Sequence, residues 1–275
     1  MTLRRAGLWT AVLAIVVWSL APGVWQVLTA LKPDRDITRV PTVYLPHPVT
    51  WKHVAALWER KPFGSYLGNS AVISGAATAL SLLFAAPAAS ALRRLSERRR
   101  RGVLGGLLVL TVFPPILLLF PLYMGVRALG WLNQPVALIL PYAALSLPLS
   151  VWILERGFGQ IPAEVEEAAM LDGLGPLRRI LKIQLPLAAP SLVTAAILAF
   201  IFSWNEFMLA LTFMTRDERK TVTAGIASVS GSSMFEIPWG QLSAAIVIAT
   251  LPLILLVLLF ERRIASGLTR GAIKG

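Results

Sequence analysis

The sequence has no cysteine, only two histidines and few charged residues for its length of 275 residues. Without cysteine there is no disulfide, thiolate metal site or cysteine nucleophile. The pattern G-x-x-x-x-G-K-[ST], which cradles ATP phosphates, is also missing, so an ATP-driven step needs another subunit. The motifs G-x-S-x-G and H-E-x-x-H do not occur either, and no acid, base or metal ligands cluster on the apolar segments. A membrane-embedded enzyme is therefore not indicated.

The two histidines, His47 and His53, lie six residues apart in a proline-bounded stretch without a nearby carboxylate pattern. Protein zinc sites combine histidine with cysteine or carboxylate ligands at defined spacing. We therefore predict that neither histidine binds a metal and that both are surface residues.

Apolar residues dominate the chain, with 56% hydrophobic and 15% charged residues and a mean hydropathy of +0.69. Soluble domains usually carry about 25% charged residues. Each of six apolar runs approaches or exceeds the roughly twenty residues that a helix needs to cross a bilayer. They are Leu8–Leu31, Tyr66–Leu92, Val103–Met124, Pro135–Leu154, Leu187–Phe213 and Leu242–Phe260. The predicted fold class is an all-α membrane protein with six transmembrane helices.

The first run follows Arg4 and Arg5, as a signal peptide would. Its apolar stretch is too long for a typical signal peptide and no cleavage site of small residues closes it. We therefore predict a retained helix.

The formal net charge of +12 would suggest a nucleic-acid partner in a soluble protein. Here the basic residues gather at the ends of apolar runs, which indicates membrane orientation rather than nucleic-acid binding. With both termini in the cytoplasm, sixteen of the 26 Lys and Arg residues lie on the inner side, most densely at Arg93–Arg101. The chain is thus predicted to be a multi-pass protein of the bacterial cytoplasmic membrane with both termini inside.

A polar island, Glu164–Pro186, separates the fourth and fifth apolar runs and falls on the predicted cytoplasmic side. Pro162 can open a helix at its first turn, and the glutamates that follow favour the positive end of the helix dipole. Gly173-Leu174-Gly175-Pro176 predicts a bend. A second short helix, Leu177–Ile183, is expected to stop before Pro186. We call this predicted helix–bend–helix segment the knob; an ordinary solvated loop is the alternative.

The spacing within the knob is specific. Glu167-Ala168-Ala169 precedes Asp172-Gly173, and nine further residues separate these from Ile183, which is followed by Leu185-Pro186. This pattern resembles the EAA loop of importer-type ABC permeases, the cytoplasmic loop that docks on an ATPase subunit. The resemblance implies an ATPase-coupling role for Glu164, Glu167, Ala168, Ala169, Asp172, Gly173, Ile183, Leu185 and Pro186. Leu174 departs from the family, which more often has alanine there.

Three other segments narrow the resemblance. Trp204-Asn205-Glu206, Phe235–Gly240 and the tail Gly267–Gly275 are similar to the maltose-transporter permease family, on the side of its second, shorter permease subunit. The resemblance implies a type I ABC importer permease fold with a cytoplasmic coupling helix. It divides the chain into residues 1–63, the first helix and outer loop, 64–260, the transmembrane domain, and 261–275, a cytoplasmic tail.

The resemblance also implies the partners. These are a homologous permease subunit, two ATPase subunits that hold ATP and Mg, an extracytoplasmic sugar-binding protein and membrane lipid, without nucleic acid. This chain itself would bind no cofactor and no metal.

Trp204, Asn205 and Glu206 are the candidates for the substrate path. An ionisable side chain in a membrane span lines a cavity or meets a partner, so Glu206 either belongs to the path or anchors the helix at the interface. Asn205 can hydrogen-bond sugar hydroxyls or a neighbouring helix. The predicted function is alternating-access import of a di- or oligosaccharide such as maltose or trehalose. The alternatives are a permease for another solute, such as a glycerol phosphate, and a secondary transporter, which usually shows repeats or matching broken helices.

Overall fold

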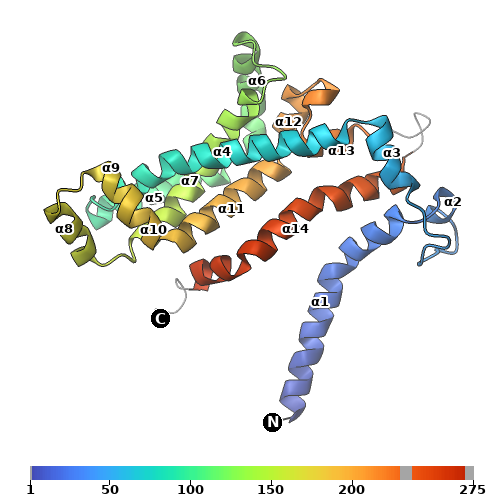
Figure 1. Ribbon diagram of the computed structural model, residues 1–275, viewed down its shortest axis with the longest axis horizontal. Coiled ribbons are helices and arrows are strands. Elements are labelled where there is room, and N and C mark those ends of the chain that lie inside the picture. The colour runs from blue at the N-terminus through green and yellow to red at the C-terminus, as the bar shows by residue number, and fades with distance from the viewer. Residues whose placement is uncertain (1, 230–236, 270–275) are drawn as a thin grey trace. The chain divides into compact units, whose positions relative to one another are not determined.

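The apolar runs fold into helices because a backbone in hydrocarbon must satisfy its own hydrogen bonds. The computed structural model describes residues 2–229 and 237–269. Phe235 and Glu236 of the predicted outer loop and residues 270–275 of the predicted tail lie outside the described residues. Within those ranges every regular element is a helix, as Figure 1 shows.

Four helices are long and apolar enough to cross a membrane, and they confirm the first, second, fourth and sixth predicted spans. They are α1 (Thr2–Ala30), α4 (Phe63–Leu92), α7 (Val136–Phe158) and α14 (Trp239–Thr269). Proline lies inside each of them, at Pro22, Pro87, Pro141, Pro148 and Pro252. Counting each bent pair of helices as one span brings the described total to six.

The third predicted span, Val103–Met124, is sharply bent rather than one straight helix. It consists of α5 (Glu97–Val112), the 3₁₀ turn η1 (Pro115–Leu118) and α6 (Leu119–Ala128), with a bend of 82°. Two consecutive prolines cause the break, because each removes an N–H donor and the residue before a proline is pushed out of helical geometry. Phe113 accordingly has φ −63° and ψ 127°.

The fifth predicted span, Leu187–Phe213, is also interrupted. It contains α11 (Ala189–Asn205) and α12 (Met208–Phe213), separated by an extended Glu206 with φ −66° and ψ 131°. No proline or glycine marks this break in the sequence. Its cause is tertiary and involves the Glu206 side chain, described below.

The chain forms two compact units, Met1–Gly64 with Gly225–Pro252 and Ser65–Ala224 with Leu253–Gly275. In the first, α2 (Asp34–Ile37) and α3 (Lys52–Arg60) follow α1. His47 is exposed as predicted, but the surface prediction for His53 is wrong, since its side chain is only 2% exposed. Its Nε2–H donates to the carbonyl oxygen of Lys32, 2.9 Å away. The segment between α1 and α4 is therefore folded around this histidine.

The second unit holds the short elements and two clusters of buried side chains. The short elements are α8 (Ala163–Leu171), α9 (Pro176–Arg179), the π-helical turn η2 (Ile180–Gln184), α10 (Leu185–Leu187), the 3₁₀ turn η3 (Asp217–Arg219) and α13 (Val222–Ala227), the last of which reaches the boundary of the unit. The cluster nearer the knob, which we call the knob-side core, consists of Ala85, Ala86, Ala89, Leu92, Leu104, Val151, Leu154, Phe158, Ile180, Ala188 and Ala195. The far core consists of Ile73, Ala77, Val126, Ala137, Leu138, Tyr142, Ala143, Leu209, Ala210, Phe213, Met214 and Ala224.

Helices α7 and α11, which flank the knob, run side by side (Figure 1) and approach each other closely near their knob-side ends. A Cβ atom built on Gly157 would lie 2.4 Å from the Ser191 Oγ and 2.5 Å from the Ser191 Cβ. Only glycine permits this approach, and small residues are the usual means by which membrane helices pack closely. The alanines of the knob-side core serve the same packing. The knob therefore rises from a tightly joined helix pair.

We predict that Gly157→Ala destabilises the protein by about 1–3 kcal/mol, the usual cost of overpacking. Ser191→Gly in the same chain should restore part of the loss because it removes both atoms that clash. Thermal unfolding in detergent measures the effect. Gly102→Ala is the matched control, since a Cβ atom there meets nothing within 4 Å. Equal melting temperatures for Gly157→Ala and Gly102→Ala would contradict the close packing.

Candidate functional site

The first half of the knob is α8, which begins at Ala163 directly after Pro162 and carries Glu164 and Glu166 in its first turn. Both carboxylates lie where the helix dipole favours negative charge. Of the predicted coupling residues in this half, Glu164, Glu167, Ala168, Asp172 and Gly173 are exposed, whereas Ala169 is buried. The acidic and small side chains thus form an outward surface on a helix that is anchored from beneath.

The predicted bend after α8 is confirmed, and it is a Schellman helix end. Gly173 has φ +75°. The Gly173 N–H donates to the Met170 carbonyl oxygen, and the Leu174 N–H donates to the Ala169 carbonyl oxygen, each at 3.0 Å. This pair of bonds satisfies carbonyl groups at a helix end and requires the left-handed conformation that favours glycine. Gly173 of the motif thus allows the left-handed turn that ends α8.

The second half of the knob differs from the prediction. Helical structure does not stop before Pro186 but continues through α9, η2 and α10 as far as Leu187. The Leu185 N–H bonds to the Ile180 carbonyl oxygen, five residues back, so the helix is widened one turn ahead of the proline. This widening accommodates Pro186, which lacks an N–H and would crowd a regular α-helical turn. Ala188 then turns the chain by 89° into α11.

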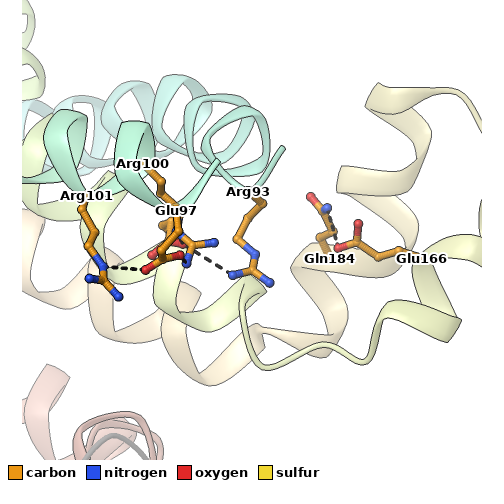
Figure 2. A network of polar contacts seen from close by, with 7 residues as sticks. Arg93, Glu97, Arg100, Arg101, Glu166 and Gln184 are labelled. Carbon is orange, nitrogen blue, oxygen red and sulfur yellow. Dashed lines mark hydrogen bonds and ion pairs between the residues drawn. The ribbon is translucent and has the colours of Figure 1, made fainter. Parts of the chain in front are cut away.

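The two halves of the knob are tied together from within. The buried Gln184 donates from Nε2 to Oε1 of Glu166 at 3.0 Å, as Figure 2 shows. Ile180 belongs to the knob-side core, so the second half is also fixed to the helix bundle. Of the remaining predicted coupling residues, Ile183 and Leu185 are half-buried and Pro186 is exposed. The knob is therefore fixed by contacts between its two halves and with the helix bundle.

Large apolar side chains nevertheless remain exposed on the knob. Leu171, at the end of α8, is 90% exposed, and Met170, Leu177 and Leu181 are exposed as well. A group of exposed apolar residues on a polar segment indicates a protein-contact surface. The motif spacing did not predict that these residues are exposed. The leucines follow no periodic pattern in the sequence that would have indicated it.

A cluster of charged residues lies at the ends of α4, α5 and α7 on the same side of the second unit (Figure 2). Glu155, near the end of α7, is buried at 4% exposure. Its Oε1 lies 3.6 Å from Nη1 of Arg93 and 3.4 Å from Nε of Arg100. The exposed Glu97 pairs with Arg100 and Arg101 on its own helix. Sequence reasoning assigned these arginines to topology and overlooked Glu155, whose position at the end of an apolar run gave no sign of a partner.

The substrate-path candidates lie at the break between α11 and α12. Trp204 is buried and stacks on Phe200 with ring centroids 5.6 Å apart. Asn205 is exposed, and its Nδ2 donates to the Ile201 carbonyl oxygen of its own helix at 2.9 Å. Glu206 is half-buried. The structure therefore does not gather the three side chains on one face, and Asn205 is the one that is exposed.

Glu206 uses its carboxylate within the chain. Oε1 accepts from the Leu209 N–H at 2.9 Å, and Oε2 accepts from the Ala210 N–H at 3.1 Å and from the Tyr142 hydroxyl at 2.5 Å. A side-chain oxygen that bonds first-turn N–H groups caps a helix start. Glu206 thereby begins α12 and joins it to α7. The sequence reasoning did not weigh this capping role, while path lining and interfacial anchoring stay predictions. Tyr142, a tyrosine in an apolar span that needs a hydroxyl partner, was the available signal for the capping role.

These features define a class before any comparison: a helical membrane protein with broken spans and a structured knob. The solved structure of a bacterial ABC transporter involved in the import of the acidic polysaccharide alginate has the same fold, with a TM-score of 0.76. The match covers 94% of this chain and 96% of that chain at 21% sequence identity. The fold is therefore that of a type I ABC importer permease, as predicted.

Residues 77–270 match the family of binding-protein-dependent transport system inner membrane components, and the chain belongs to this family. It is 39% identical to the trehalose transport system permease protein SugB of Mycobacterium tuberculosis, covering 99% of each chain. It is 38% identical to the trehalose/maltose transport system permease protein MalG of Thermococcus litoralis, covering 99% of this chain and 98% of that one. It is also 38% identical to the sulfoquinovosyl glycerol transport system permease protein SmoH of Agrobacterium fabrum, covering 95% of this chain and 91% of that one. The chain is a sugar ABC transporter permease of the inner membrane, a transport component and not an enzyme.

We predict that Gly173→Ala frays the end of α8, whereas Gly173→Asn does so much less. A left-handed conformation costs a residue with a Cβ atom about 1–2 kcal/mol, and asparagine visits it more readily. Amide hydrogen exchange of the segment 170–175 measures the fraying. Gly175→Ala is the control because Gly175 has φ −64° and a Cβ atom there meets nothing within 4 Å. Identical exchange in all three variants would refute the Schellman assignment.

We predict that Glu206→Ala lowers stability by about 1.5–3 kcal/mol, the usual effect of losing hydrogen bonds to a charged group. Glu206→Gln should lose less because one acceptor oxygen remains. Thermal unfolding in detergent measures the order wild type, Gln, Ala. Glu218→Ala, at an exposed carboxylate outside the spans, is the matched control. If Glu206→Ala unfolds with the wild type, the carboxylate is not a cap.

Proposed function

We propose that this chain is a permease subunit of an ATP-driven importer of a di- or oligosaccharide and that its knob docks on an ATPase subunit. The observation that carries the proposal is the knob itself. It is fixed by Gln184, Ile180 and the Schellman turn, yet it presents exposed leucines beside an acidic, small-residue face. A rigid projection with an apolar tip transmits force from a partner, because neither its fold nor its base yields to contact.

The orientation in this proposal places the knob and both termini in the cytoplasm. Support comes from the arginine distribution, since Arg94, Arg98, Arg99 and Arg101 are exposed at the α4–α5 turn. Positively charged short loops stay on the cytoplasmic side. The α4–α5 turn and the knob then lie on the cytoplasmic side of the membrane. ATP is available there to the ATPase subunits, which are separate chains and hold ATP together with Mg.

The proposed solute is a neutral sugar. Within the six apolar runs of the sequence, Glu206 is the one Asp, Glu, Lys or Arg residue, and its carboxylate already accepts three hydrogen bonds. A glycerol phosphate would require cationic groups for its phosphate. The names of two relatives, a trehalose and a trehalose/maltose permease, also support a neutral sugar.

Within this proposal the path candidates have separate roles. Exposed Asn205 contacts the solute or the second, homologous permease subunit. Trp204 and Glu206 shape the break between α11 and α12 from the protein side. Import proceeds by alternating access, with solute delivered by an extracytoplasmic binding protein, the partner that the family description names.

We predict that Leu171→Asp weakens binding of the cognate ATPase subunit by about 10–100-fold. Burying a leucine side chain contributes about 1.5–3 kcal/mol, and a tenfold change in affinity corresponds to 1.4 kcal/mol. Because Leu171 is 90% exposed, its substitution should leave folding and membrane insertion intact. Copurification of the ATPase subunit and sugar-stimulated ATP hydrolysis measure the effect.

The matched control is Val40→Asp, which changes a residue that is 91% exposed in the outer segment. It should leave ATPase binding unchanged. The reversal Glu167→Lys on the acidic face should weaken binding in the same direction as Leu171→Asp. Wild-type ATPase recovery with both knob variants would show that the knob is an ordinary solvated loop.

A further inference from the structure

We infer that Glu155 is a positioning residue that makes α4 and α5 move together with the knob. This inference rests on the proposed docking of the knob on an ATPase subunit. The distinguishing observation is one buried carboxylate shared by two arginines from two other helices.

The geometry of the shared carboxylate is specific. Arg93 follows directly after the last residue of α4, and Arg100 lies in the first turn of α5. Both guanidinium groups converge on Oε1 of Glu155 in α7, as Figure 2 shows for the two arginines. Three helices therefore meet at a single oxygen atom.

Burial makes this junction hard to separate. The Glu155 side chain is almost fully withdrawn from solvent, so moving either helix away would leave a buried charge with fewer partners. Breaking one side of a buried ion pair is far more costly than breaking an exposed one. Glu97 provides the contrast: it is half exposed and pairs with arginines of its own helix, so it joins nothing to α7.

Arg93 is also held against the backbone that leads into the knob. A Cβ atom on Gly159 would lie 2.9 Å from Nη1 of Arg93. The Gly159 N–H bonds to the Glu155 carbonyl oxygen at 2.9 Å, so Gly159 directly follows the last turn of α7 as its C-cap. The Arg93 guanidinium thus lies at the C-terminal end of α7, where the helix dipole favours a cation.

The consequence concerns the transmission of motion. Knob movement reaches α7 and α11 through the chain itself, because both helices are continuous with it and are locked at Gly157 and Ser191. Helices α4 and α5 are not adjacent to the knob in the sequence, and they contact α7 through the apolar knob-side core. The Glu155 ion pairs add a polar tie to this contact, so that a displacement of the knob carries these two helices along.

The test compares Glu155→Gln with Glu97→Gln in the assembled transporter reconstituted in liposomes. Both substitutions remove one carboxylate that faces Arg100, but only the first removes the ion pairs that join α7 to Arg93 and Arg100. Sugar taken up per ATP hydrolysed is the readout. We expect this ratio to fall about tenfold for Glu155→Gln, within the usual range for coupling between sites, and to stay at the wild-type value for Glu97→Gln.

A purely structural role would lower uptake and ATP hydrolysis in parallel and leave the ratio unchanged, which would overturn the inference. Glu155→Asp, which keeps the charge, should restore most of the ratio.

ATPase binding separates this test from that of the proposed function. Glu155→Gln should still copurify with the ATPase subunit, whereas Leu171→Asp should not. Loss of the ATPase subunit from Glu155→Gln would overturn the inference by making Glu155 part of docking.

A second pair of variants tests the junction without touching the carboxylate. Gly159→Ala displaces the Arg93 guanidinium, whereas Gly102→Ala adds the same atom to α5 where nothing lies within 4 Å. We expect a lower ratio for Gly159→Ala alone. Should Glu155→Gln fail to reach the membrane, this pair decides the matter: equal ratios for the two alanine variants would overturn the inference.

Discussion

The close approach of α7 and α11 at Gly157 and Ser191 is the constraint on which the rest of the second unit depends. The knob connects these two helices, so the separation of their ends sets the span that it bridges. With a larger residue at position 157 the base would open. Ile180 and Ala188 would then leave the knob-side core that holds the second half of the knob. Packing within the bundle therefore shapes a surface that is itself largely exposed.

Two carboxylates join α7 to other helices, one toward each of its ends. At the far end, Tyr142 of α7 donates to Glu206, which caps α12 after the break in the fifth span. At the knob end, Glu155 of α7 collects arginines from α4 and α5. Charges are costly in or near hydrocarbon unless they are paired or hydrogen-bonded. Each of these carboxylates meets that requirement by joining α7 to other helices.

The sequence pattern predicted the apolar helices and the bend at Gly173 because both depend on local composition and on backbone conformation. Pro114 and Pro115 gave a local signal for the break in the third span. The break at Glu206 is marked by no proline or glycine, and the Glu206 carboxylate that caps α12 also bonds Tyr142, 64 residues away. The continuation of the helix past Pro186 depends on a π-helical turn that no residue type announces.

The candidate site was likewise predictable only where its residues are close in sequence. The motif spacing located the knob and its acidic face, because those residues are neighbours in sequence. The exposed position of Leu171, the burial of His53 and the pairing of Glu155 arise from tertiary packing between distant segments. Membership of a sugar permease family follows from the comparisons and adds no residue-level geometry. These side-chain positions therefore rest on contacts that a linear pattern does not contain.

Because the chain has no cysteine, single-cysteine labelling offers the most direct measurement of the central claim, that the knob is a cytoplasmic surface covered by an ATPase subunit. Leu171→Cys and Val40→Cys would each be exposed to a membrane-impermeant maleimide in right-side-out and inside-out vesicles. The account predicts that Leu171→Cys reacts in inside-out vesicles alone and is protected once the ATPase subunit is bound. Val40→Cys should react in right-side-out vesicles alone. Labelling of Leu171→Cys from the outside, or undiminished labelling with the ATPase subunit bound, would contradict the account.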